Sequence, residues 1–189
     1  MPVLYFGAQA AAAPFFPNFS FAAHTASMLG SNLSLHPEVL NTGAALAGAW
    51  GLFQGLRSRG VWTVVALLVA ACSVSFGLSS LWAATHPLPD PAHNPGALGA
   101  GMFAAPLVVL LASVRLHRAT LLRMYLGANV AGFLLVASIY SGLIPVNLDQ
   151  YAGAIQRLGA LIMLLPTAVL AVWLLRAQLR TSSHEPITA

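Results

Sequence analysis

The chain has 189 residues, of which 58% are hydrophobic and only 6% are charged, whereas about a quarter of the residues in a soluble domain are charged. Its mean hydropathy is +0.80, and no stretch outside the apolar runs is long enough to bury a core of its own, which excludes a soluble domain. The net charge of +4 comes from arginines at the ends of apolar runs. Arginines in those places orient a membrane protein, so we exclude nucleic acid as a partner and predict one transmembrane domain, residues 1–189, in a lipid bilayer.

Six apolar runs approach the length of a transmembrane helix, which needs about 20 mostly apolar residues. They predict an all-α membrane bundle of six helices. The predicted spans cover residues 3–17, 37–56, 61–84, 97–114, 121–144 and 158–175. The first run is short because Pro14 and Pro17 end it. Pro166 lies inside the last run, where neighbouring helices make a proline tolerable in lipid.

Two glycines in the second span, Gly51 and Gly55, form a pair of small residues four positions apart. Such pairs allow two helices to approach closely in a membrane. We therefore expect a neighbouring helix to pack against this face.

The arginines distinguish the two sides of the membrane. In the six-span arrangement seven of the eight lie on one side, and only Arg157 lies on the other. Because positive residues favour the cytoplasmic side, we predict that both termini are cytoplasmic. The loops at 18–36, 85–96 and 145–156 then share the outer face, the first with one short amphipathic or re-entrant turn.

The most polar interruption of the apolar pattern lies between the third and fourth spans, and it contains His86, Asp90 and His93 among four prolines. The prolines exclude a helix and stiffen the loop, because each lacks an amide donor and restricts the residue before it. A stiff loop holds side chains at low entropic cost, which suits a binding or catalytic edge and a plain connection equally well. Both interpretations remain open.

With this topology, most of the groups that could pair charges gather on the outer face. They are Glu38, Asp90, Asp149, His24, His36, His86, His93 and Arg157. Ionisable groups next to hydrocarbon are costly, so their concentration indicates a functional site, although outer loops are also polar without any function.

Metal binding is one chemistry open to this face. The candidate ligands of zinc or copper are His24, His86, Asp90 and His93, since imidazole and carboxylate groups are normal ligands of these metals. Their spacing does not form the helical pair of histidines that is typical of zinc proteases.

The other two chemistries open to this face are anion binding and acid–base catalysis. Arg157 at the start of the sixth span would clamp a phosphate or carboxylate headgroup, or would pair with Asp149 or Asp90. A histidine and an aspartate would transfer protons on a lipid substrate, but no G-x-S-x-G or comparable nucleophile motif accompanies them.

Several short motifs occur in a characteristic order along the chain. They are Pro17-Asn-Phe-Ser20, Leu29-Gly-Ser31, Leu40-Asn41-Thr-Gly43, Asp90-x-x-His93, Tyr151-Ala-Gly153 and Gln156-Arg157. In this order the chain resembles a family of bacterial and archaeal six-span membrane proteins catalogued as domain of unknown function family 998. The resemblance implies a six-span fold and a prokaryotic cytoplasmic membrane, and it implies no activity. Many members have Glu-Arg where this chain has Gln156-Arg157.

Our leading hypothesis is a protein that binds an amphiphile or a lipid headgroup in an outward-facing polar pocket, as a carrier, receptor-like protein or accessory subunit. Arg157 would clamp the anion and Asp90 and His93 would orient the ligand. The other candidate ligand-binding residues are Asn41, Tyr151 and His24. The alternatives are a membrane-embedded, metal-assisted hydrolase and a structural subunit that docks through Gly51 and Gly55.

Overall fold

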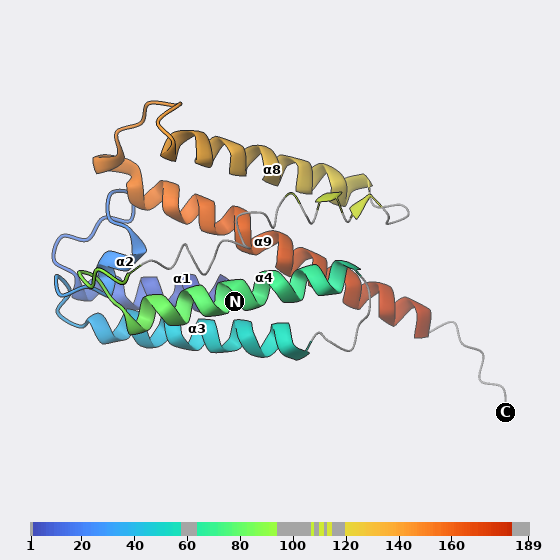
Figure 1. Ribbon diagram of the computed structural model, residues 1–189, viewed down its shortest axis with the longest axis horizontal. Helices are drawn as coiled ribbons and strands as arrows, with labels where there is room; N and C mark the ends of the chain where they lie inside the picture. The colour runs from blue at the N-terminus through green and yellow to red at the C-terminus, as the bar shows by residue number, and fades with distance from the viewer. Residues whose placement is uncertain are drawn as a thin grey trace.

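The computed structural model describes residues 2–57, 64–93, 107, 110–111, 113–114 and 120–182. This part of the chain contains helices and no strand, as predicted. The helices are α1 (Pro2–Ala12), the 3₁₀ turn η1 (Ala13–Phe15), α2 (Ala26–Leu29), α3 (Pro37–Arg57), α4 (Val64–Thr85), α8 (Thr120–Tyr140) and α9 (Leu148–Ser182). The four long helices run side by side along the length of the molecule, and α1 lies against one half of α3 (Figure 1).

The first predicted span, 3–17, is a shorter helix than expected. α1 ends at Ala12, so it is about 16 Å long at 1.5 Å per residue, against about 30 Å for the hydrocarbon core. Pro14 lies at the start of the 3₁₀ turn that follows, where its missing amide prevents the helix from continuing. α1 by itself therefore covers only about half of such a core.

The second and third predicted spans agree well with α3 and α4. α3 begins at Pro37, which is acceptable in the first turn, and ends at Arg57. The two helices cross where Gly48 faces Gly77, and a Cβ atom at either glycine would lie 2.8 Å from the carbonyl oxygen of the other. Gly51 is buried on the same face. The close approach of α3 to α4 is thus made at Gly48, three residues before Gly51.

The fourth predicted span, 97–114, lies almost entirely outside the described residues. The fifth, 121–144, agrees with α8 except that α8 ends at Tyr140. Gly142 adopts a φ of +76°, and its amide donates to the carbonyl of Ile139 at 3.0 Å. A glycine in the left-handed region ends a helix, which explains the earlier end.

The sixth predicted span, 158–175, lies within α9, which begins earlier, at Leu148, and has 35 residues. Asn147 caps the helix. Its side-chain oxygen accepts a hydrogen bond from the amide of Asp149 at 3.1 Å, and its carbonyl accepts one from the amide of Tyr151 at 3.1 Å. Residues 148–156, which the sequence placed in an outer loop, therefore form the first turns of α9.

The three predicted outer loops do share one end of the molecule. The connection from α1 to α3, residues 86–93 and residues 141–147 all lie at the end marked by α2 in Figure 1. The first connection contains one short helix, α2, as expected. We call this end the loop end.

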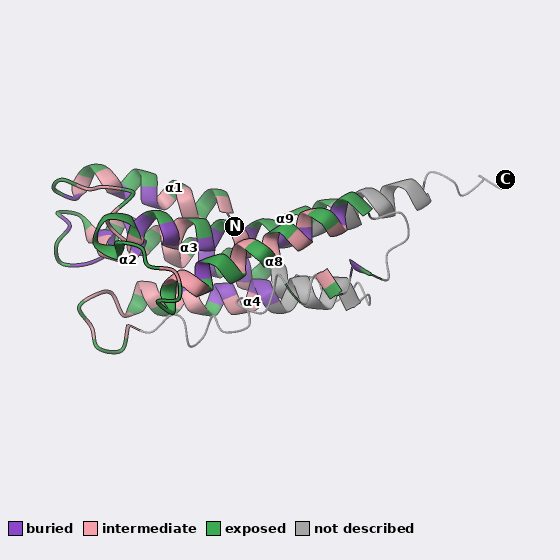
Figure 2. Ribbon diagram, turned by 90° about the horizontal axis from the view of Figure 1, so that it is seen from above, coloured by how far each residue is buried: buried purple, intermediate pink, exposed green. Residues whose placement is uncertain are grey.

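Much of the outer side of the long helices is exposed (Figure 2), and many of the exposed side chains are large and apolar. Leu121 is 83% exposed, Leu134 is 59% exposed and Trp50 is 44% exposed, whereas Gln9 is 1% exposed and Ser73 is 3% exposed. Of the described residues, only α8 forms a helix long and apolar enough to cross a membrane, and 17% of its most apolar stretch is buried.

Candidate functional site

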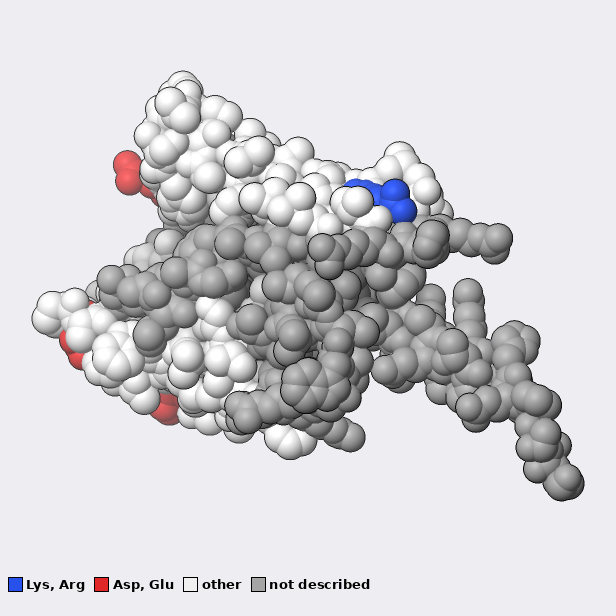
Figure 3. Space-filling view, turned by 45° about the vertical axis from the view of Figure 1, so that its right-hand side comes forward, with Lys and Arg blue, Asp and Glu red and all other residues white. Residues whose placement is uncertain are grey.

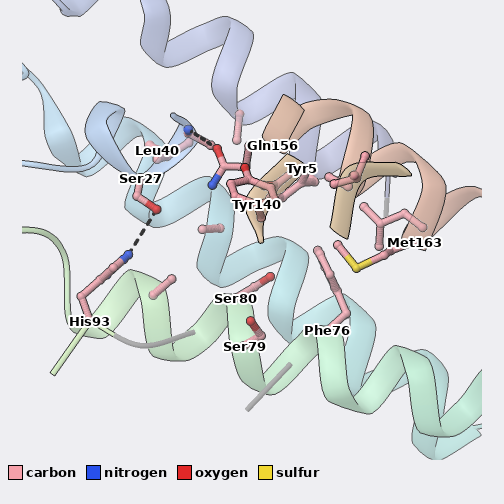
Figure 4. A pocket seen from close by; sticks show the side chains of 18 of the residues that line it. Tyr5, Ser27, Leu40, Phe76, Ser79, Ser80, His93, Tyr140, Gln156 and Met163 are labelled. Carbon is pink, nitrogen blue, oxygen red and sulfur yellow. Dashed lines mark hydrogen bonds between the residues drawn. The ribbon is translucent and has the colours of Figure 1, made fainter. Parts of the chain in front are cut away.

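A cavity of about 720 Å³ lies between the helices and reaches the loop end. Its apolar wall comes mainly from Tyr5, Leu40, Phe76, Phe133, Val136, Met163 and Leu164. Its polar groups include Ser27, Asn41, Ser79, Ser80, His93 and Gln156. Figure 4 shows Ser27, His93 and Gln156 toward the loop end, with Phe76 and Met163 deeper between the helices. The cavity is therefore a mainly apolar space with polar groups at the loop end and two serines, Ser79 and Ser80, beside Phe76.

His93 lies on the cavity wall, and both ring nitrogens have partners. Nδ1 is 2.6 Å from the carbonyl oxygen of His86, and Nε2 is 3.2 Å from Oγ of Ser27. A carbonyl oxygen can only accept, so Nδ1 carries a proton, and in the neutral form of the ring Nε2 is the atom that accepts from the Ser27 hydroxyl. This arrangement fixes both the orientation and the tautomer of His93.

Gln156 also faces the cavity, from the third turn of α9. Its Oε1 accepts a hydrogen bond from the amide of Ala26 at 2.6 Å. Because a backbone amide can only donate, this contact assigns the oxygen and the nitrogen of the side chain. The amide nitrogen is left on the cavity side in Figure 4, without a hydrogen-bond acceptor among the described residues.

Asn41 reaches the cavity from the second turn of α3. Its Nδ2 donates to the carbonyl of Gly30 at 3.1 Å, and its Oδ1 lies so close to Gly30 that a side chain there would collide with it. Gly30 therefore allows the loop after α2 to pack against Asn41. Two of the predicted ligand-binding residues, Asn41 and His93, thus line one cavity although they are distant in the sequence.

Arg157 does not line this cavity, where it was expected to clamp a headgroup, and it does not contact Asp90 or Asp149, which was the alternative pairing. Its Nη1 instead donates to three backbone carbonyls, of Phe21 at 2.8 Å, His24 at 2.9 Å and Gly153 at 3.0 Å. The position of Arg157 on a helix explains the difference, because its side chain extends back along α9 to the loop that crosses it.

The aromatic rings of that loop cover the guanidinium. The centroid of the Phe21 ring is 4.9 Å from Cζ of Arg157, and that of Phe19 is 5.6 Å away. Its Nε and Nη2 are buried and have no hydrogen-bond partner among the described residues. Cation–π attraction to the two rings partly compensates for this burial.

Gly153 allows the loop to approach α9 closely. A Cβ atom there would collide with the carbonyl of His24 and would lie 2.7 Å from that of Phe21. The amide of Ala154 donates to the carbonyl of Ala22 at 2.8 Å. We call Gly153, Arg157 and the carbonyls of Phe21 and His24 the arginine clasp, because they fasten the first loop to α9.

The four proposed metal ligands are not brought together. Among the described residues, no three His, Cys, Asp or Glu side chains are grouped closely enough to hold a metal ion. His24 accepts from the amide of Ser20 at 3.1 Å, and the His86 ring stacks on Trp82 at 3.9 Å. Asp90 accepts from the amide of Ala92 at 2.8 Å, within its own turn. These three side chains therefore make their contacts within their own loop or helix turn, and not with one another.

The remaining predicted residues do not line the cavity. Tyr151 is 49% exposed on the first turns of α9. His36 pairs with Glu38 at 2.8 Å. Neither faces the cavity.

Two functional candidates were missed by reasoning from the sequence, Ser27 and the amide nitrogen of Gln156. Serine is common in polar loops, and nothing in the sequence connects Ser27 to His93 across 66 positions. Gln156 was noted only for the motif that it forms with Arg157. The capping residue Asn147 was a usable signal, because it predicts that Gln156 lies on a helix and not in a loop.

No protein-family model, curated protein or solved structure matches this chain. The arguments below therefore rest on its residues and their geometry.

Proposed function

We propose that this chain is a multi-pass membrane protein that binds an amphiphile, with the apolar part of the ligand in the cavity and its polar part at the loop end. The observation that carries the proposal is the cavity of about 720 Å³, which is within the range of small-molecule sites, about 300–1,000 Å³. An apolar wall with a few polar groups toward one end matches a molecule that has one apolar and one polar end.

The exposed apolar surface supports a membrane location. α8 has 21 residues and is about 31 Å long, which suits a hydrocarbon core of about 30 Å. Leu121, Leu134 and Leu135 on this helix are between 48% and 83% exposed. A core helix of a soluble protein would bury such side chains, so lipid is the natural covering.

The distribution of charge supports the orientation that we propose, with the loop end outside the cytoplasm of a prokaryotic cell and both termini inside. In Figure 3 the visible carboxylates lie toward one end of the molecule, and an arginine lies toward the other. Asp90 lies within a loop of the loop end, and Glu38 and Asp149 lie in the first turns of the helices that follow the other two loops. Arg123 lies at the start of α8, at the opposite end, which accords with the positive-inside rule.

A cavity-filling substitution tests the binding. Ala44 lines the cavity from α3, so Ala44→Phe should weaken binding of a fluorescent dansyl fatty acid to the purified full chain by about tenfold or more, because the ring would occupy the ligand's space. Ala49 is an exposed residue of the same helix that does not line the cavity, and Ala49→Phe serves as the control. Equal binding by both variants would overturn the proposal.

Thiol labelling in intact cells tests the orientation. Ala92 is exposed at the loop end and Thr120 is exposed at the start of α8. A cysteine that replaces Ala92 should react with an impermeant maleimide, and one that replaces Thr120 should react only after the cells are opened. The opposite pattern would show that the loop end faces the cytoplasm.

A further inference from the structure

Ser27 and His93 form a serine–histidine pair on the cavity wall. Oγ of Ser27 is 3.2 Å from Nε2 of His93, and both residues line the cavity. They come from α2 and from the loop after α4, and Figure 4 shows the hydrogen bond between them. A hydroxyl bonded to an imidazole beside an apolar ligand site is the arrangement of a nucleophile and its general base.

The base of this pair has a fixed orientation. The His86 carbonyl accepts from Nδ1 at 2.6 Å, which leaves Nε2 with a free electron pair toward Ser27. In serine hydrolases a carboxylate has this orienting function, and here a backbone carbonyl replaces it. The loop that carries the carbonyl is itself held by a hydrogen bond from Nε1 of Trp82 to the Ala92 carbonyl at 2.8 Å.

Gln156 supplies hydrogen-bond donors on the same wall. Its oxygen is bonded to the amide of Ala26 at 2.6 Å, one residue before Ser27, so its NH₂ group is available on the cavity side. Donors placed in this way stabilise the negative oxygen that develops when a nucleophile attacks a carbonyl. The wall therefore combines a nucleophile, an oriented base and an oxyanion donor.

From this geometry we propose that the site catalyses acyl transfer from an amphiphilic carboxylic ester, with Ser27 as the nucleophile. The proposal rests on the proposed function, since the cavity must first bind the acyl chain. Its apolar lining, which includes Phe76, Phe133 and Met163, suits an aliphatic acyl group.

The reaction has two steps. In the first, Oγ of Ser27 attacks the ester carbonyl while Nε2 of His93 removes the hydroxyl proton. The bond to the alcohol then breaks, His93 returns the proton to the leaving alkoxide, and an acyl–Ser27 ester remains. In the second step, water attacks this ester with His93 again as base, the bond to Oγ breaks, the carboxylic acid leaves, and Ser27 regains its proton. In both steps the Gln156 amide donates to the carbonyl oxygen.

An alkyl fluorophosphonate probe tests the nucleophile, because it forms a bond from Oγ to phosphorus and releases fluoride. Incubation of the detergent-solubilised full chain should give one adduct, located at Ser27 by peptide mass spectrometry. Ser27→Ala should abolish the adduct, and His93→Gln should slow labelling by about 100-fold. Gln156→Glu keeps an acceptor for the Ala26 amide but loses the N–H donors, and it should slow hydrolysis of p-nitrophenyl decanoate by about 100-fold.

Ser31→Ala is the matched control. Ser31 is buried four residues beyond Ser27, its hydroxyl donates to the Met28 carbonyl at 2.7 Å, and it does not line the cavity. Labelling should be unchanged in this variant. Dansyl fatty acid binding, measured on every variant, separates the two proposals. A wild-type chain that binds the fatty acid but gives no Ser27 adduct would overturn acyl transfer and leave the binding function intact. An adduct at Ser27 without fatty acid binding would confirm a reactive serine but overturn the binding function, and with it the amphiphilic ester as the substrate.

Discussion

Two polar clusters lie at the loop end, and they use their hydrogen-bonding groups in different ways. In the arginine clasp, the guanidinium of Arg157 bonds to three backbone carbonyls and lies under two aromatic rings. In the cavity cluster, His93 and Ser27 bond to one another through their side chains and line an open space. The residue with a permanent charge fastens the fold, whereas the serine and the histidine line the space that is open to a ligand.

The difference shows that charge near hydrocarbon is not sufficient to identify a functional group. A guanidinium cannot lose its proton in a protein, so it needs acceptors wherever it is placed. Three carbonyls supply them for Nη1 of Arg157 and also immobilise the first loop. The histidine and the serine have weaker solvation requirements, so they can line the cavity with few other partners.

Substitution of Arg157 should have the largest effect on stability. Arg157→Leu leaves three carbonyls without their charged donor and releases the loop from α9, so it should lower the free energy of unfolding by about 3 kcal/mol. Arg157→Lys should cost less, because an ammonium retains a charged donor but loses the planar face that lies against the rings. Thermal unfolding in detergent measures both. A Leu variant as stable as wild type would contradict the clasp.

Gly153→Ala should have the next largest effect. The added methyl group collides with the His24 carbonyl, and the loop must move, which should cost about 2 kcal/mol. Gly127→Ala is a useful control, since nothing lies within 4 Å of the Cβ that it would add on α8. If both variants unfold at the same temperature, the close approach of the loop to α9 does not contribute to stability.

His93→Gln should separate the two clusters. It removes the Ser27 partner but not the clasp, so we expect a stability change of about 1 kcal/mol or less. Arg157→Lys should show the reverse, with lower stability and nearly normal Ser27 labelling. Equal losses of stability in the two variants would mean that the clusters act as one structural unit.

The smallest effect should be the coupling between Asp90 and Arg157. The Asp90 carboxylate accepts from the amide of Ala92, and an asparagine oxygen can do the same, so Asp90→Asn should change stability by less than about 0.5 kcal/mol. Because the two residues do not contact each other, a double-mutant cycle with Arg157→Lys should give a coupling energy near zero. A coupling above about 1 kcal/mol would restore the ion pair expected from the sequence.

Much of the fold could be predicted from local signals. Pro37 and Arg57 indicated both ends of α3, and the run from residue 61 to 84 predicted α4. The early start of α9 at Leu148 was missed because the prediction followed the length of the apolar run and did not use Asn147 as a helix cap. The early end of α8 was missed because it depends on the left-handed backbone conformation of one glycine, Gly142.

The candidate site could be predicted only in part. Asn41 and His93 do line the cavity, as expected for a site at the loop end. The partner of Arg157 could not be found from the sequence, because its acceptors are backbone carbonyls, and every residue has one. The pairing of Ser27 with His93 was equally hidden, since it depends on the fold of two loops 66 positions apart.

The sequence by itself determined that the chain is helical and apolar, and that its polar loops gather at one end, because helix length and hydrophobicity are properties of contiguous residues. Only the tertiary structure decided which polar groups meet. The cavity needs walls from α1, α3, α4, α8 and α9 together, and hydrogen bonds of about 3 Å depend on positions that no local pattern specifies. For that reason the charged Arg157 became part of the scaffold, and the unremarked Ser27 became the candidate nucleophile.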